Sequence, residues 1–384
     1  MNAEIITIGT ELLLGEIVDT NAVAIARRLR SIGLDLYYMT TVGDNLERIA
    51  RAVTIAQQRA SVIITTGGLG PTVDDVTREA VAQATGRRLV LSPELLAQIE
   101  AFFARLQRPM SPNNRRQAYI PEGAKPIPNP VGTAPGFIVE TQHGAIICLP
   151  GVPREMEYLM DHAVLPYLRE RFHLQGIIKV HILRTVGIGE SEIDARIADL
   201  MTSPNPTVGL SAHAGQTDVR VTAKAQTEEE AHRLLTDMVN RVRERLGVVI
   251  YGENDETVEG VVQRLLQERG WTLAYAGEDL DLIARLRSVG ASLHVEIEDR
   301  PLADESLARA RARELRERTH RDVALVVHAT PEGQTCIAAV APTGERVFSV
   351  PYTAAESAYR ARWISNLALD AVRRLALTSP SANP

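Results

Sequence analysis

Short runs of apolar, β-branched residues recur in the first part of the chain and alternate with segments whose apolar residues follow helical spacing. Three of these runs predict buried parallel strands: Ile5 to Ile8, Leu34 to Val42 and Ser61 to Thr65. Helices are predicted after each strand, the third from Val76 to Thr85. This alternation predicts βαβ units on a parallel sheet, and ligands bind such sheets beyond the carboxyl ends of the strands.

A glycine-rich turn connects the third strand to its helix. The turn contains Gly67, Gly68, Gly70 and Thr72. Glycines let a ligand approach the backbone closely, and free amides at a helix start suit a phosphate. The turn therefore predicts a ligand site. The alternative is a plain tight turn in which an aspartate caps the helix.

Two adjacent carboxylates, Asp74 and Asp75, complete this turn. Paired carboxylates repel a bare phosphate, so their presence indicates a hard divalent cation between them and the phosphate oxygens.

The first strand leads into a second polar stretch, and its end holds more polar residues than one helix cap requires. Gly9, Thr10 and Glu11 open the stretch, and Asp19, Thr20 and Asn21 precede a helix to about Arg30. Both polar stretches follow strands of one parallel sheet, so they are expected to line one cleft. Capping plus a turn is the alternative explanation for 19–21.

Two later segments are candidates for the same cleft. Residues 108–136 are predicted to be irregular, and a long irregular section within a compact domain is usually functional. After a hairpin of 136–140 and 145–149, Pro150 and Gly151 join a strand to a helix reaching about Phe172. Two interpretations of Glu155 stay open: it faces a metal, or it only lies in the first turn of that helix, where the helix dipole favours a carboxylate. Basic residues could supply cations for phosphates, although exposed ones are more often simply solvated: Arg115, Arg116 and Lys125.

Two further domains are predicted after the first. Residues 176–251 form a small α/β module. Residues 255–377 form a third domain, after a linker at 252–255. Within the third domain, 303–320 is strongly charged and predicts a solvated amphipathic helix.

The overall composition excludes several functional classes. A formal net charge of −6 provides no basic field to attract nucleic acid. No apolar run is long enough to cross a bilayer, and the first residues read as a strand without the features of a secretion signal. Cys148 and Cys336 are expected to be buried free thiols in a reducing cytoplasm, and the histidines show no zinc-site spacing.

Taken together, several spaced motifs resemble the CinA family of competence/damage-inducible proteins. They are the stretch 9–15 with Asp19-Thr20-Asn21, the turn 66–75, the segment 129–137 that contains Gly132 and Thr133, and the segment 149–153. The resemblance covers the chain from Met1 to about Tyr251. It implies a three-layer, mostly parallel α/β domain of the molybdopterin-binding MoaB/MogA type in 1–172. It also implies a small α+β KH-like domain in 176–251, and a homodimer. The Gly187-Ile188-Gly189 segment does not fit the G-x-x-G clamp of RNA-binding KH modules, so no nucleic-acid partner is expected.

The resemblance also implies an activity. In this family the first domain is associated with metal-dependent hydrolysis of the ADP-ribose pyrophosphate, which gives AMP and ribose 5-phosphate. The family's C-terminal α/β domain is usually a nicotinamide mononucleotide deamidase. Its Glu-Ser-Cys-Thr-Gly-Gly motif is replaced here by Ala276-Gly277-Glu278-Asp279-Leu280, and its Thr-Gly-Ile-Ala-Gly-Pro motif by residues 328–333. The chain is therefore predicted to keep this fold without deamidase activity.

The resulting hypothesis places a phosphate on the glycine turn and Thr72. Asp19 and Asp75, with Asp74 or Glu11 nearby, would hold a divalent cation of unknown identity that bridges the pyrophosphate of a nucleotide substrate. The residues do not say which carboxylate is a ligand and which is a base. Two alternatives stay open: a molybdopterin-binding or adenylylating enzyme of cofactor synthesis, and a non-catalytic nucleotide-binding scaffold.

Overall fold

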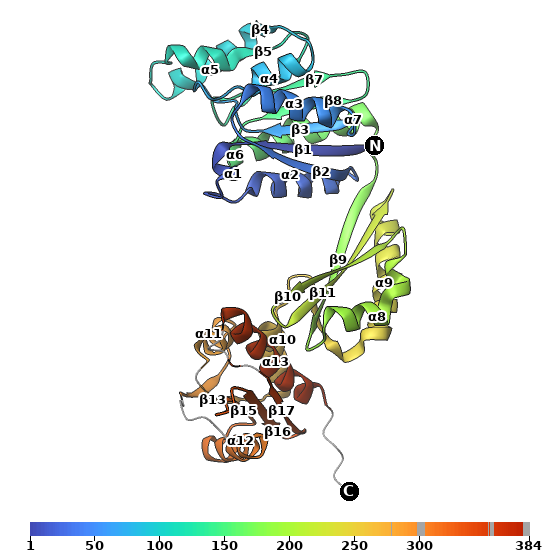
Figure 1. Ribbon diagram of the computed structural model, residues 1–384, viewed down its shortest axis with the longest axis vertical. Coiled ribbons are helices and arrows are strands. Elements are labelled where there is room, and N and C mark those ends of the chain that lie inside the picture. Colours follow the sequence, from blue (N-terminus) through green and yellow to red (C-terminus); the bar gives the residue numbers. More distant parts are fainter. Residues whose placement is uncertain (278, 298–303, 352, 354–356, 379–384) are drawn as a thin grey trace. The chain divides into compact units, whose positions relative to one another are not determined.

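The computed structural model describes residues 1–277, 279–297, 304–351, 353 and 357–378. The chain divides into two compact units (Figure 1). Unit 1 contains residues 1–179 and 224–231, and unit 2 contains 180–223 and the residues from 232 onward. Each unit is described by itself.

Unit 1 is built on a six-stranded sheet with the order β2-β1-β3-β8-β7-β6. The parallel strands are β1 (Asn2–Ile8), β2 (Asp35–Val42), β3 (Val62–Thr66) and β8 (Ala145–Leu149). The antiparallel edge consists of β7 (Gly136–Glu140) and β6 (Lys125–Ile127). The predicted mostly parallel α/β sheet is confirmed.

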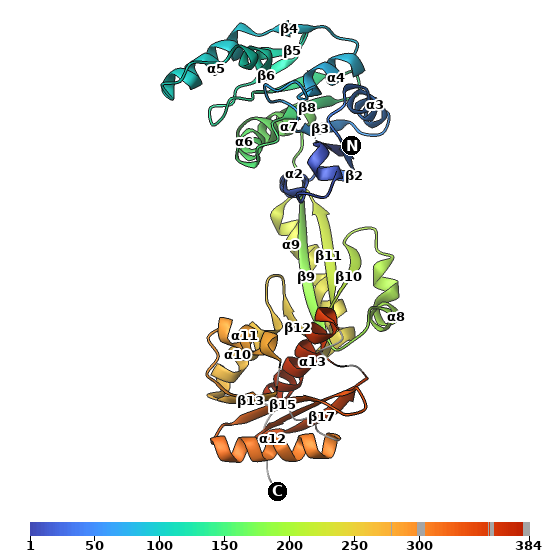
Figure 2. The same ribbon diagram turned by 60° about the vertical axis from the view of Figure 1, so that its left-hand side comes forward.

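Helices cover both faces of this sheet. Neighbouring residues of each strand point to opposite sides, so the apolar strands present two apolar faces that need to be covered. Ile6 packs on one face and Ile5 on the other, and Ile63 and Ile64 divide in the same way. One face is covered by α3 (Leu46–Gln57), α4 (Thr77–Ala84) and α5 (Pro93–Arg105). The other face is covered by α2 (Thr20–Ser31), α6 (Pro153–Leu159), a π-helical turn (Met160–Val164) and α7 (Leu165–Phe172). Figure 2 shows this layering from a second direction.

The KH-like module lies mostly in unit 2, although the start of β9, the end of β11 and the start of α9 are counted in unit 1; its sheet has the strand order β10-β11-β9-β12. Its strands are β9 (Ile177–Val186), β10 (Thr207–His213), β11 (Gln216–Ala225) and β12 (Ile250–Glu253). Two helices, α8 (Glu190–Met201) and α9 (Glu228–Leu246), contribute to the core of this module; a 3-10 turn (Gly247–Val249) precedes β12.

The second sheet of unit 2 has the order β14-β13-β15-β16-β17. Parallel β14 (Leu293–Glu296), β13 (Leu273–Gly277) and β15 (Val323–Ala329) continue into antiparallel β16 (Thr335–Ala341) and β17 (Gly344–Val350). Three helices pack on one face: α10 (Val258–Arg269), α11 (Leu280–Ser288) and α13 (Ala358–Leu377). The predicted α/β character of this domain is confirmed.

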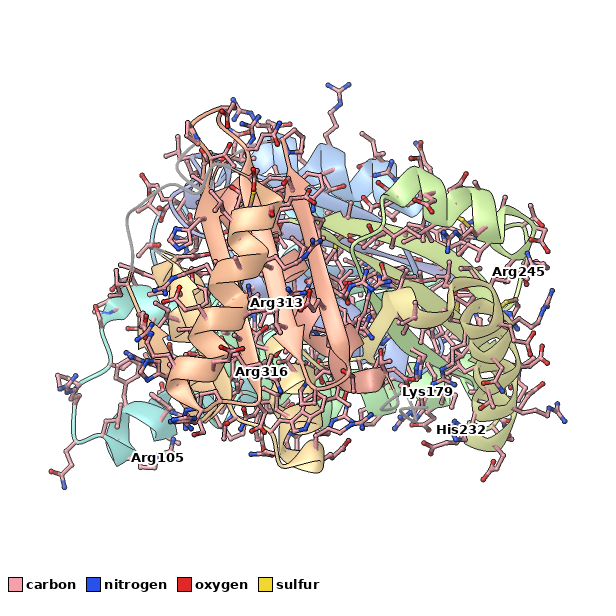
Figure 3. The ribbon with its side chains drawn as sticks, turned by 90° about the horizontal axis from the view of Figure 1, so that it is seen from below. Arg105, Lys179, His232, Arg245, Arg313 and Arg316 are labelled. Carbon is pink, nitrogen blue, oxygen red and sulfur yellow. The ribbon has the colours of Figure 1, made fainter. Side chains whose placement is uncertain are left out.

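The charged segment near residue 310 forms α12 (Glu305–Thr319) on the opposite face of that sheet. Ala308, Ala312 and Leu315 are fully buried, so a narrow stripe of mostly small residues is enough to attach the helix. Arg313 points away from this stripe and pairs with Glu345 of β17 (Figure 3). The predicted helix is present, although residues 298–303 lie outside the described part of the chain.

Helix α13 also contacts the KH-like module within unit 2. Asn366 donates to the carbonyl oxygen of Ala214 at 2.7 Å, and Arg373 donates to that of Val248 at 2.5 Å. A Cβ built on Gly215 would lie 2.3 Å from the Trp363 ring, so that ring packs directly on the β10–β11 turn. The three residues of α13 are three and seven positions apart, which places them on one face of the helix.

Several elements differ from the sequence-based expectation. The predicted irregular section 108–136 contains a 3-10 helix (Pro112–Ala118), β5 (Tyr119–Pro121) and β6. Strand β5 pairs with β4 (Leu89–Leu91), and both are too short to show periodicity. The predicted linker at 252–255 overlaps β12, whose pairing with β9 joins residues about 65 positions apart and leaves no local signal. No helix in the described part of the chain has the length and apolar character needed to cross a bilayer.

Candidate functional site

The glycine turn after β3 depends on residues without a Cβ atom. Gly67 has φ 110° and Gly68 has φ 63°, both in the region that favours glycine. A Cβ on Gly67 would lie 2.1 Å from the carbonyl oxygen of Ile8, which is too close for any other residue. The turn is therefore pressed against the end of β1.

Side chains from the surrounding helices hold the carbonyl oxygens of this turn. The Thr77 hydroxyl donates to Gly67 O at 2.9 Å, and Gln117 donates to Leu69 O at 3.3 Å. The Arg78 guanidinium donates to Leu69 O and, at 3.3 Å, to Gly70 O. The backbone amides of Gly68 and Leu69 have no hydrogen-bond partner among the described residues. A turn with fixed carbonyls and unpaired amides presents donors to an anion.

Arg78 is the buried charge behind the turn, with 1% of its surface exposed. Burial lowers the pKa of its guanidinium to about 10, against the opposing effect of the nearby Glu79 and Asp75 carboxylates. Its Nε atom is buried without a partner. A second arginine, Arg116, donates to the carbonyl oxygens of Thr72 and Asp75, so it braces the turn from outside.

The two aspartates of the turn have different surroundings. Asp75 accepts the amides of Gly70 and Thr72, each at 2.8 Å, and the Thr72 hydroxyl. Its carboxylate therefore bonds within the turn, and α4 has no side-chain cap, so the capping part of the alternative is wrong for Asp75. Asp74 is exposed. The pKa of the Asp74 carboxyl is lowered, mainly by the nearby Thr72 side chain.

A cavity of about 130 Å³ lies beside the turn, at the carboxyl ends of β1 and β3. Its polar wall consists of Thr7, Glu11, Asp19, Thr20, Asn21 and Thr66, with the backbone of Gly151. Its apolar wall consists of Ile8, Leu12, Ile17, Val18 and Pro153. The structure thus brings the first polar stretch together with the end of β3 and with Gly151. The other predicted site residues of these segments are not among the residues that line this cavity: Gly9, Thr10, Gly67, Gly68, Gly70, Thr72, Asp74, Asp75 and Pro150. The two polar stretches therefore do not line this cavity together.

Asn21 connects the three segments that form the cavity. Its Nδ2 donates to the Thr66 hydroxyl at 3.0 Å and to Gly151 O at 2.8 Å. Thr66 in turn donates to Pro150 O at 2.9 Å. The Asn21 Oδ1 atom is buried without a partner. Asp19 caps α2 through Oδ1, which accepts the amide of Ala22 at 2.9 Å.

The segment after β1 is held by a residue of the loop after β2 that the sequence-based reasoning missed. Asp44 accepts the amide and the hydroxyl of Thr10, at 2.7 and 2.9 Å, and so orders the short helix α1 (Thr10–Leu13). The Glu11 carboxylate folds back over Gly9, where a Cβ would lie 2.5 Å from its Oε1 atom. Asp44 follows the end of β2, so its position beyond a third parallel strand was the available signal.

The predicted segment with Gly132 and Thr133 packs on Glu155 of α6. A Cβ on Gly132 would lie 2.0 Å from the Glu155 carboxyl carbon, and Asn129 donates to Glu155 Oε2 at 2.6 Å. Partial burial raises the pKa of the Glu155 carboxyl. Neither Gly132 nor Thr133 is among the residues that line the cavity.

No group of three or more His, Cys, Asp or Glu side chains in the described residues could hold a metal ion. Asp19 lies in the cavity wall, whereas Asp75 is engaged in the glycine turn. The predicted pair of metal ligands is therefore divided between two local structures.

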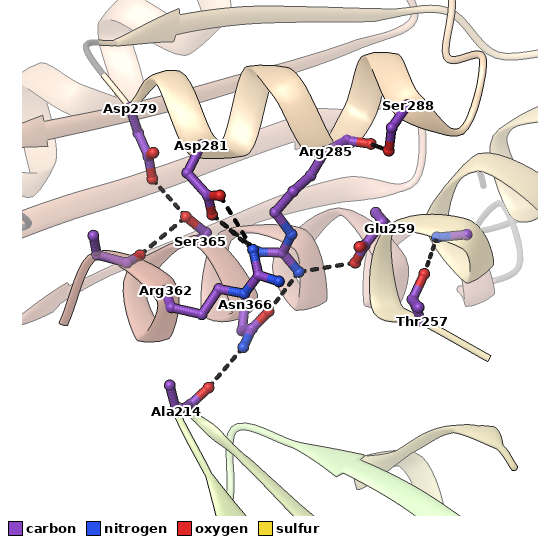
Figure 4. Close-up of polar contacts among 12 residues, drawn as sticks. Ala214, Thr257, Glu259, Asp279, Asp281, Arg285, Ser288, Arg362, Ser365 and Asn366 are labelled. Carbon is purple, nitrogen blue, oxygen red and sulfur yellow. Dashed lines mark hydrogen bonds and ion pairs between the residues drawn. The ribbon is translucent and has the colours of Figure 1, made fainter. Parts of the chain in front are cut away.

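In unit 2, Asp279 stands at the end of β13, where the deamidase motif was sought. It caps α11 by accepting the amide of Leu282 at 3.1 Å, and it accepts the Ser365 hydroxyl at 2.5 Å (Figure 4). The same close-up shows buried Arg285 donating to Glu259 and to Asn366, both at 2.8 Å. These polar groups pair with one another across α10, α11 and α13.

Comparison with protein families identifies two domains. Residues 4–170 match the family described as "Probable molybdopterin binding domain", and residues 181–252 match the "Damage-inducible protein CinA KH domain".

Curated relatives match most of this chain. A CinA-like protein from Dictyoglomus turgidum is 45% identical over 277 residues, which is 72% of this chain and 67% of the relative. A competence-damage inducible protein from Halothermothrix orenii is 46% identical over 276 residues. The match spans 66% of that relative's length, and 65% of a relative from Caldicellulosiruptor bescii at 49% identity.

Solved structures are similar to part of this chain. The protein CinA from Thermoplasma acidophilum is 37% identical, with a TM-score of 0.40, over 44% of this chain and 96% of that one. The molybdopterin biosynthesis enzyme MoaB from Thermus thermophilus is 22% identical, with a TM-score of 0.33, over 45% and 94%.

Proposed function

The chain belongs to the CinA family, with a molybdopterin-binding-like domain followed by a CinA KH domain, and from this premise we propose a hydrolase. The first domain hydrolyses the pyrophosphate of ADP-ribose, or of a related nucleoside diphosphate compound, to AMP and ribose 5-phosphate. The observation that supports this most is the glycine turn, whose carbonyls are held from behind and whose Gly68 and Leu69 amides have no partner among the described residues. Such a turn suits a phosphate oxygen.

The proposal includes dependence on a divalent cation, but no preformed metal site is found among the residues that the structure describes. The described residues contain no three-ligand group, and the Asp75 carboxylate already accepts three donors. Mg²⁺ in nucleotide enzymes is bound largely by substrate phosphates and water, with one or two carboxylates. We therefore place the cation with the pyrophosphate of the incoming substrate and assign no protein ligand to it.

The residues of the chain act mainly by binding and orienting in this proposal. The turn amides hold one phosphate, and Arg78 and Arg116 keep the turn in shape. The cavity between Glu11 and Gly151 receives the part of the substrate next to the pyrophosphate. Asp74, Asp19 and Glu11 are carboxylates at the surface of this region, and one of them would orient the attacking water.

A second candidate function is molybdopterin binding or adenylylation in cofactor synthesis. The description of the family matched by residues 4–170 favours it. The two candidates differ in ligand, so a comparison of the affinities for molybdopterin and ADP-ribose separates them. A third possibility, a nucleotide-binding scaffold, would bind ADP-ribose without cleaving it.

Three further properties belong to the same proposal. The protein acts as a homodimer in the cytoplasm, its partner is a small nucleotide and no nucleic acid, and the C-terminal domain does not deamidate nicotinamide mononucleotide. A screen of nucleoside diphosphate compounds with Mg²⁺, Mn²⁺, Co²⁺ and Ni²⁺ tests the main claim, with AMP release as the readout. Absence of turnover for every compound and metal would overturn it.

A further inference from the structure

The cavity beside the glycine turn has an unusual balance of polar groups. Within the described part of the chain, no Lys, Arg or His side chain lines it, whereas the carboxylates of Glu11 and Asp19 do. A wall with two carboxylates and no cation disfavours a phosphate group, because like charges repel. The phosphate and the cavity ligand are therefore different parts of a substrate, or different molecules.

The polar groups of the wall have more acceptor than donor capacity. The Thr66 hydroxyl and both Nδ2 hydrogens of Asn21 are already used between wall segments, while Asn21 Oδ1 is buried without a partner. Asp19 uses Oδ1 for the helix cap, and no described residue donates to Oδ2. A ligand that supplies O–H donors completes this wall, because a carboxylate only accepts hydrogen bonds.

We propose that this cavity is a subsite for the vicinal diol of a ribosyl group, with Asp19 and Glu11 accepting its hydroxyls. A carboxylate is the usual acceptor for ribose hydroxyls in nucleotide sites. The apolar side chains of Leu12, Ile17 and Val18 face the carbon skeleton of the sugar from the other wall. Asp19 is thereby a ribose ligand instead of the metal ligand expected from the sequence. The inference rests on the proposed function in taking ADP-ribose as the ligand.

The test uses Asp19→Asn, because asparagine caps a helix as well as aspartate does and the fold is expected to be kept. Asp304→Asn is the matched control: Asp304 caps α12 through Leu307 N at 2.9 Å, in the other unit. Glu11→Gln is the second variant. Calorimetry with EDTA measures the binding of three ligands to the full chain. The first is ADP-ribose. The second is the β-methyl ester of ADP, which lacks the distal ribose. The third is an ADP-ribose whose adenosine is 2′,3′-dideoxy, so that it lacks the diol of the adenosine ribose.

The expected result is a loss of at least about tenfold in ADP-ribose affinity for Asp19→Asn, and none for Asp304→Asn. The analogue that lacks the bound diol should bind the wild type and Asp19→Asn equally, and the other analogue should show the full loss. This comparison identifies which ribose occupies the cavity.

Three outcomes would overturn the inference: equal losses for all three ligands, no loss for either Asp19→Asn or Glu11→Gln, and no binding of ADP-ribose. A loss that appears only when Mg²⁺ replaces EDTA would assign Asp19 to a metal and also overturn it. The hydrolase proposal is decided separately, by AMP release. Binding with the expected ratios but without cleavage would reject the hydrolase and keep the ribose subsite.

Discussion

The guanidinium of Arg78 donates to the backbone carbonyl oxygen of Leu69 from a position that is almost completely removed from water. The two residues lie nine positions apart, on the helix and the turn of one strand–turn–helix segment. The contact fixes the direction of the Leu69 carbonyl, and hence of the peptide planes on either side of it. A buried cation thus determines the shape of a turn that is proposed to bind an anion.

Arg78→Met should lower the free energy of unfolding by about 1–3 kcal/mol, because the carbonyls of Leu69 and Gly70 lose buried donors. The loosened turn should also bind ADP-ribose more weakly. Urea unfolding and calorimetry measure the two effects. The control is Arg88→Met, which removes an exposed pair with Glu122 and should change stability by less than about 0.5 kcal/mol. Equal effects of the two substitutions would contradict the role of Arg78.

Substitution by alanine should affect stability differently at the two aspartates of the turn. Asp75→Ala removes the acceptor of three hydrogen bonds, so it should cost about 1–2 kcal/mol of stability and abolish turnover. Asp74→Ala changes an exposed side chain, so stability should stay within about 0.5 kcal/mol while turnover falls. Thermal unfolding and AMP release are the measurements. Full activity of Asp74→Ala would show that Asp74 has no role in turnover. Full activity of Asp75→Ala would contradict the proposal that the glycine turn binds the substrate.

Glu155 and Glu140 should give pH effects of opposite sign. The pKa of Glu155 is raised by burial, so its contribution to stability is present at low pH and is lost as the pH rises through its folded pKa. Glu155→Gln cannot ionise and keeps an acceptor for Asn129, so it should be more stable than the wild type at pH 7 but not at pH 4.

The pKa of Glu140 is lowered, mainly by hydrogen bonds from Lys125 and Tyr167. Its contribution is present above the ordinary pKa and is lost as the pH falls through the folded pKa. Glu140→Gln should therefore be less stable than the wild type at pH 7, with a smaller difference at pH 3. Urea unfolding at these pH values measures both variants. The same sign of pH dependence for the two would show that at least one of these assignments is wrong.

Purified protein should release no ammonia from nicotinamide mononucleotide. The end of β13 carries Asp279, whose carboxylate is occupied by the α11 cap and by Ser365. An active deamidase added to the same sample provides the positive control for the ammonia assay. Ammonia release by the protein alone, lost on changing Asp279 or Ser365, would show that this domain has kept an activity through different residues.

The sequence predicted the elements whose signals are local. Gly67 and Gly68 stood between an apolar strand and a helix, and both adopt the positive φ that makes glycine necessary. The role of Arg78 gave no such signal, because its helix position is ordinary and its partners are backbone atoms. Asp75 was predicted to bind a metal because of its charge, whereas the geometry of its own turn determines what its carboxylate contacts.

The missed residues depend on distant contacts. Asp44 acquires its partner Thr10 only when β1 and β2 pair, at a separation of 34 positions. Strand β17 has three exposed residues at its start and gains its position from pairing with β16. Local periodicity does not reveal which distant strands pair. The parallel strands of the core were therefore predictable, whereas the edge strand β17 was not.

The contacts of α13 with the β10–β11 turn have a consequence for the solubility of shortened forms of the chain. Trp363 covers Gly215, and Arg373 satisfies the carbonyl of Val248, so the KH-like module has a neighbour that shields it from water. Truncation before α13 would expose both groups and favour aggregation of what remains. The C-terminal domain is therefore expected to stabilise the KH-like module through these contacts, independently of any chemistry of its own.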